Sequence, residues 1–165
     1  MYLKNQDLII EGQNILSLSS IQLVNKEFEI NCLFNSNVFR EDIRPLYIKE
    51  NPEKNYLKSL FIPEHLKIEN FKYFNHKEKL LNFLKNEPIA NEWIEDEEGF
   101  LRLIEKFKAL TINNLNDCYL ISKNWFSIND NIVRDREFVL YEYYILLIWL
   151  NKEQNMVYVC EWFCD

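Results

Sequence analysis

The feature that most constrains the fold is a long apolar segment, Phe138 to Leu150, followed after a polar loop by a second one, Met156 to Phe163. The first segment is apolar at both alternating positions and carries Glu142 as its one charge. A strand of this kind has to be buried on both faces. Residues 151–155 between the two segments are polar and suit a hairpin loop. The pattern therefore predicts a central antiparallel hairpin that is covered on one side by helices and on the other by further protein or by a partner.

Folding the two segments about this loop predicts the pairing of individual residues. If Leu150 opposes the first residue after the loop, Ile145 opposes Glu161 and Tyr144 opposes Trp162. In this register Glu142 and Glu161 point to opposite faces, so they form no acid and base pair of the glycosidase type, although a shift of one residue would change that. A buried Glu could serve as a base, or it could pair with an arginine.

The remaining chain predicts a single α+β domain over residues 1–165, with an antiparallel sheet packed against a central helical segment. Strands are expected in 1–34, helices in 51–110 and an antiparallel meander in 117–165. The expected shorter strands are Asp7 to Ile10, Ile15 to Leu18, Ile21 to Val24, Phe28 to Phe34, Cys118 to Ile121 and Trp125 to Ile128; the expected helices follow Asn51, lie between Asn75 and Pro88, and run from Glu97 to Leu110.

Two of these segments carry clear periodicity. In Phe28 to Phe34 every second residue is apolar, which predicts a half-buried strand. In Glu97 to Leu110 the apolar residues recur at helical spacing and form one face of a helix. They are Phe100, Leu103, Ile104, Phe107 and Leu110.

Composition excludes several classes of function. Two glycines cannot supply a phosphate-binding GxGxxG or Walker loop, and a net charge of −7 opposes direct binding of nucleic acid. The four cysteines are dispersed, and His65 and His76 stand beside charged residues without a hydrolase or metal motif. We therefore expect no catalytic residue, cofactor or metal. No apolar run is long enough to span a bilayer and the N-terminal residues do not resemble a signal peptide, so we expect a cytoplasmic protein with no membrane partner.

One segment combines an aromatic residue with a dense run of acids. Between Glu92 and Glu98 five carboxylates surround Trp93. Such a composition suits docking against a basic protein groove. Equally, acids at the start of a helix complement its dipole, and Trp93 could close the core. The expected partner-binding residues are Glu92, Trp93, Glu95, Asp96, Glu97 and Glu98, with Asp130 and Asp135 as a second, weaker acidic site.

The sequence carries no motif of a known family. In size, acidity and absence of a catalytic signature, it resembles the immunity proteins that neutralise polymorphic or contact-dependent bacterial toxins. That resemblance implies a stoichiometric inhibitor that occludes a basic nuclease, and a phage-encoded blocker of a host nuclease would have the same properties. The alternative is a small ligand-binding protein or enzyme whose pocket is lined by aromatic residues. These are Tyr141, Tyr143, Tyr144, Trp149 and Trp162.

Overall fold

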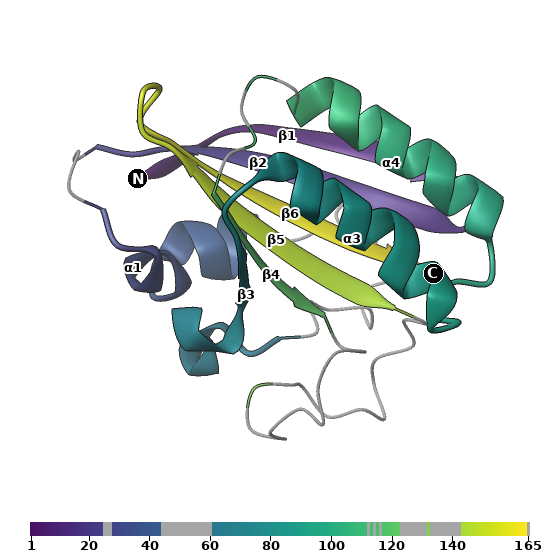
Figure 1. Cartoon of the computed structure of the whole chain (residues 1–165). Helices are drawn as coiled ribbons and strands as arrows, with labels where there is room; N and C mark the ends of the chain where they lie inside the picture. The colour runs from purple at the N-terminus through teal and green to yellow at the C-terminus, as the bar shows by residue number, and fades with distance from the viewer. Residues whose placement is uncertain are drawn as a thin grey trace.

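The computed structural model describes residues 1–24, 28–43, 61–111, 113, 115, 117–122, 132 and 143–164. Its described strands form one antiparallel sheet of six, in the order β1-β2-β6-β5-β4-β3 (Figure 1). This confirms the predicted α+β fold with an antiparallel sheet. The strands are β1 (Tyr2–Glu11), β2 (Asn14–Gln22), β3 (Lys72–Phe74), β4 (Cys118–Ser122), β5 (Tyr144–Asn151) and β6 (Met156–Cys164).

The N-terminal and C-terminal hairpins meet in the middle of the sheet, where β2 pairs with β6 from Asn14↔Cys164 to Gln22↔Met156. All nine residues of β6 are buried, and so are seven of the eight residues of β5. Strands with apolar residues on both alternating faces gain most when both faces are covered, which is why these two occupy the centre. The predicted central hairpin is confirmed.

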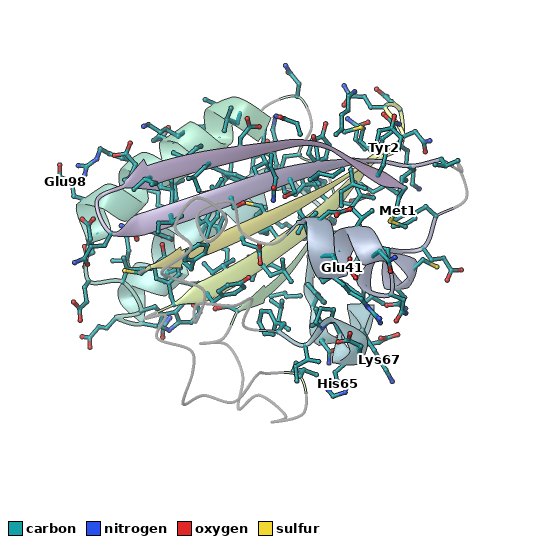
Figure 2. All side chains as sticks on the ribbon, turned by 180° about the vertical axis from the view of Figure 1, so that it is seen from behind. Met1, Tyr2, Glu41, His65, Lys67 and Glu98 are labelled. Carbon is teal, nitrogen blue, oxygen red and sulfur yellow. The ribbon has the colours of Figure 1, made fainter. Side chains whose placement is uncertain are left out.

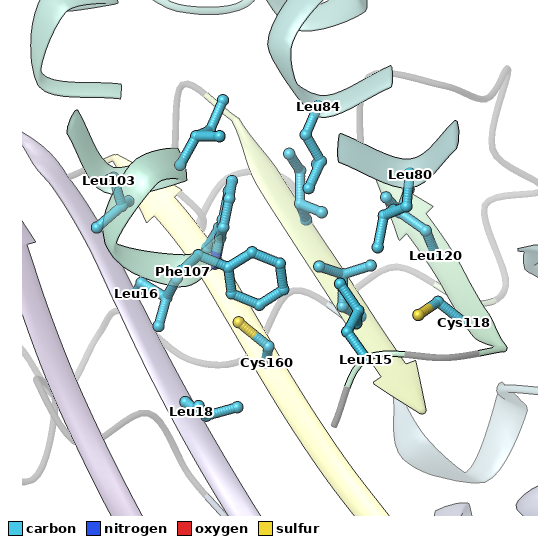
Figure 3. Packing of buried hydrophobic residues seen from close by; sticks show 14 of the residues in the cluster. Leu16, Leu18, Leu80, Leu84, Leu103, Phe107, Leu115, Cys118, Leu120 and Cys160 are labelled. Atoms are coloured by element: carbon cyan, nitrogen blue, oxygen red, sulfur yellow. The ribbon is translucent and has the colours of Figure 1, made fainter. Parts of the chain in front are cut away.

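Helices α3 (Lys77–Ala90) and α4 (Glu97–Thr111) cover one face of the sheet (Figure 1). The apolar stripe of α4 packs there against two tryptophans from the central strands, with the Phe107 ring 5.1 Å from that of Trp162 and 6.0 Å from that of Trp149. Figure 3 shows Leu16, Leu103 and Phe107 meeting in this core. The predicted helix from Glu97 is confirmed.

The opposite face packs against a short helix α1 (Ile30–Phe34), a π-helical turn η1 (Val38–Asp42) and two 3-10 turns, η3 (Pro63–His65) and η4 (Ile68–Asn70). The ring of Phe34 stacks on that of Phe71 at 5.5 Å. Phe61 meets Tyr144 edge to face at 5.7 Å. The sheet thus separates two apolar cores.

The predicted strand from Phe28 to Phe34 is wrong, because residues 30–34 form helix α1. Alternation would bury Cys32, but the structure exposes Cys32 and buries its neighbours Leu33 and Phe34. Burial of adjacent residues suits a helix end packed on a sheet, and this tertiary packing overrides the local period of two. The strands predicted at Ile15 to Leu18 and Ile21 to Val24 are parts of one strand, β2, which ends at Gln22 and not at Val24. Ser19 lies within this strand, and its hydroxyl accepts a hydrogen bond from the Gln6 side chain at 2.9 Å.

The predicted register of the central hairpin is wrong by one residue. Asn151 belongs to β5 and pairs with Met156, so the turn has the four residues 152–155. Asn155 closes this turn with a φ of 53°, the left-handed region that asparagine tolerates better than most residues. As a result Leu146, and not Ile145, opposes Glu161. The predicted end of the second helix before Pro88 is also wrong, since α3 continues to Ala90.

Predictions for the helix after Asn51, the strand from Trp125 to Ile128 and the start of the strand at Phe138 lie outside the described residues. So do Glu142 and Tyr141.

Candidate functional site

The acidic segment links α3 to α4 at one end of the sheet, beside the turn between β1 and β2. Asp96 precedes α4 and accepts a hydrogen bond from the Gly99 amide at 2.9 Å, as a helix-capping side chain does. Its other carboxylate oxygen accepts hydrogen bonds from the backbone N–H of Gln13 at 3.3 Å and from the side-chain amide of Asn14 at 3.1 Å. Asp96 therefore fixes the start of α4 to the β1–β2 turn.

The same contact continues into the core. Asn14 is fully buried, and its side-chain oxygen accepts a hydrogen bond from the Tyr143 hydroxyl at 2.8 Å. Two glycines leave room for the Asp96 carboxylate, since a Cβ built on Gly12 or Gly99 would come within 2.0 or 2.2 Å of its Oδ2. Asp96 is thus part of the scaffold that holds the start of α4, and its role in binding a partner stays a prediction.

A second anchor lies one turn along α4. Glu11 of β1 pairs with Arg102 at 2.9 Å and also with Lys106. Hydrogen bonds from Lys106 and Arg102 lower the pKa of Glu11 below its usual value. Arg102 pairs in addition with Glu98 at 2.5 Å, so the Glu98 charge is matched within the helix.

Besides Glu98, three acids of the segment are exposed: Glu92, Glu95 and Glu97. Among the described residues no lysine or arginine forms an ion pair with any of them. Trp93 between them is partly buried against the core that α3 and α4 form with the sheet. The structure therefore gives Asp96 and Glu98 contacts within the fold and leaves Glu92, Glu95 and Glu97 exposed, and docking of a partner at these three residues stays a prediction.

Sequence reasoning missed one member of this surface. Leu101 lies four residues after Glu97 on the same side of α4, and its side chain is 36% exposed while Leu103 is fully buried. The signal available in the sequence was a leucine that lies outside the apolar stripe of the helix. We call Glu92, Trp93, Glu95, Glu97 and Leu101 together the acidic edge. Asp130 and Asp135, the weaker predicted site, lie outside the described residues.

The predicted aromatic pocket is filled where the structure describes it. Tyr143, Trp149 and Trp162 pack in the core beneath α3 and α4, whereas Tyr144 faces the opposite core. All four side chains are fully buried. Because of the changed register, Glu161 shares the face of Tyr144 and accepts a hydrogen bond from its hydroxyl.

A groove of about 810 Å³ lies at the other end of the sheet, between the β5–β6 turn and the start of α1. None of the predicted aromatic or acidic site residues lines it.

Within the described part of the chain, no three His, Cys, Asp or Glu side chains gather as metal ligands would. The helices described there are all too short or too polar to cross a membrane. No protein-family model matches the chain, and no curated protein or solved structure is significantly similar to it.

Proposed function

We propose that this protein is an acidic, stoichiometric inhibitor that binds a basic protein through the acidic edge, in the manner of an immunity protein that occludes a toxin nuclease. The observation that carries the proposal is the group of three exposed carboxylates, Glu92, Glu95 and Glu97, around a tryptophan that is anchored in the core. Protein interfaces favour an aromatic anchor surrounded by a polar rim, and carboxylates in that rim add charge complementarity to a basic partner.

Electrostatics supports this proposal both at long range, through the net charge, and at short range, through the exposed carboxylates. The net charge of −7 accelerates encounter with a basic partner, and exposed carboxylates at one place orient it. Leu101 adds an apolar contact beside these charges, where removal from water would slow dissociation.

The acidic edge is also held rigidly. Asp96 ties its backbone to the β1–β2 turn, and Glu11 ties the following helix to β1 through Arg102. A surface that is already ordered loses little conformational entropy on binding, so more of its contact free energy appears as affinity.

The test begins with the genes that adjoin the gene of this chain, where we expect one to encode a basic nuclease domain; absence of such a gene counts against the proposal. We expect the protein to protect cells that express the nuclease and to bind it one to one. The triple variant Glu92→Gln, Glu95→Gln, Glu97→Gln should slow association several-fold and flatten its dependence on salt. Leu101→Ala should act mainly on the dissociation rate and raise it by up to about tenfold.

The matched control removes three exposed acids elsewhere, by Glu41→Gln, Glu69→Gln and Glu78→Gln. This control changes the net charge equally, so it separates the general attraction from the local one. No protection by the wild-type protein, or equal slowing by both triple variants, contradicts the proposal.

A further inference from the structure

The groove at the far end of the sheet has the anatomy of a binding surface. Its floor consists of partly buried apolar side chains that pack on the core of the sheet, namely Phe28, Ile30, Tyr119 and Leu150. They come from three separate parts of the chain, the start of α1, strand β4 and the end of β5. A volume of about 810 Å³ is within the range of pockets that hold ligands.

The rim of the groove is acidic. Glu29, Asp117 and Glu153 stand on it, with Lys152 as the one cation among the lining residues that the structure describes. All four side chains are exposed. These described side chains together carry a charge of −2, from three carboxylates and one ammonium group.

An aromatic wall extends the rim on the side of β3. The rings of Tyr73 and Tyr119 lie 5.2 Å apart, and the Tyr73 hydroxyl donates a hydrogen bond to Asp117 at 2.7 Å. A tyrosine ring beside a carboxylate attracts a cation through both its face and the neighbouring charge. The groove thus offers apolar contact at its floor and cation binding at its rim.

We propose that this groove is a second docking surface, which takes an extended basic segment of a protein partner, with an apolar side chain on the floor and a Lys or Arg at the rim. The groove is partly open to solvent, so an extended chain can lie in it without being enclosed. Charge complementarity selects a basic occupant.

This surface is separate from the acidic edge. Along β2 the two ends of the sheet are eight residues apart, from Asn14 to Gln22, or about 26 Å. Figure 2 shows the same separation, with Glu98 at one end of the molecule and Met1 and Tyr2 at the other. The proposal therefore does not rest on the inhibitor function, and either can fail without the other.

The test follows a capped, fluorescein-labelled peptide of alternating Lys and Leu by anisotropy, together with amide chemical shifts of the protein. We expect shifts at Asn113, Asp117 and Lys152, and none at Glu92 or Glu95. The variant Glu29→Gln with Glu153→Gln should weaken binding by roughly fivefold. The control variant Glu41→Gln with Glu78→Gln should leave it unchanged.

Several outcomes would overturn this assignment. Equal weakening by both double variants would mean that only net charge attracts the peptide. Shifts centred on the acidic edge would place the peptide there. If N-acetyl-lysine amide bound with the same affinity as the peptide, the groove would be a small-molecule pocket and no docking surface for a chain.

Discussion

Asp96 shows how one carboxylate of an acidic run can be structural while its neighbours stay available to a partner. Its two oxygens accept bonds from the start of α4 and from the β1–β2 turn. Glycine at positions 12 and 99 makes that approach possible, because a side chain at either position would collide with the carboxylate. At Gly12 the φ of 60° also favours glycine.

Asp96→Ala should therefore destabilise the fold by about 1–2 kcal/mol, from loss of the helix cap and of the bonds to the turn. The exposed neighbour Glu95 offers the matched control, and Glu95→Ala should stay within about 0.5 kcal/mol of the wild type. Urea unfolding measures both. Equal stability of the two variants would show that Asp96 does not anchor the turn.

Tyr73 provides a prediction about pH. Its hydrogen bond to Asp117 raises the Tyr73 pKa from 10.0 to about 12, since a tyrosinate would lie beside the carboxylate. The folded state then holds this proton more tightly than the unfolded state does. The resulting stabilisation is complete below pH 10 and is lost as the pH rises towards about 12.

Asp117→Asn should return the Tyr73 pKa towards its ordinary value. The measurement is an NMR titration of the Tyr73 ring carbons, with Tyr73→Phe to assign the signal. A titration that is the same in wild type and in Asp117→Asn would show that the hydrogen bond is absent in solution.

At the scale of elements, sequence reasoning succeeds where one face of an element decides its conformation. The stripe of α4 is buried from Phe100 to Phe107 as its helical period predicts, but its last predicted member, Leu110, is 47% exposed. The same reasoning fails for residues 28–34. Their alternating apolar residues favour a strand, but residues distant in sequence bury the adjacent Leu33 and Phe34, which favours a helix. No local pattern contains those contacts.

The hairpin register shows a second limit. The polar residues 151–155 predict the turn, but Asn151 enters the strand because it can pair with Met156 once Asn155 adopts a positive φ. This difference of one residue decides which side chains share a face with Glu161. Of the candidate site, the sequence predicts the exposed acids and the anchoring of Trp93, but not Leu101 or the groove, which tertiary packing creates.

Helix α4 allows a direct test of its two faces. Leu103→Ala should cost about 2–5 kcal/mol, because the side chain is fully buried and its removal leaves a cavity. Leu101→Ala on the exposed side should cost less than about 1 kcal/mol. Thermal or urea unfolding of the pair measures the difference. Similar losses for both would contradict the orientation of α4 and would make Leu101→Ala unsuitable as a binding variant.

For the whole molecule, the order of the sheet determines where stability resides. Strand β6 has a neighbouring strand on each side, and both of its faces are buried. β3, with three residues, lies at one edge, and two of the three are exposed. The free energy needed to open a backbone hydrogen bond should therefore rise from this edge to the centre.

Native-state hydrogen exchange should show this gradient. Amides of β6 and of the facing residues of β2 and β5 should exchange only on global unfolding, at the full stability of about 5–15 kcal/mol that is typical of a domain. The amides of β3 should open at a clearly lower free energy, because local opening there breaks one short ladder and exposes few apolar side chains. Adding Asp96→Ala should lower protection in β6 by its full effect on global stability, while β3, which already opens locally, should change little. Protection in β3 equal to that in β6 would mean that the sheet opens only as a unit, and would contradict this account of its stability.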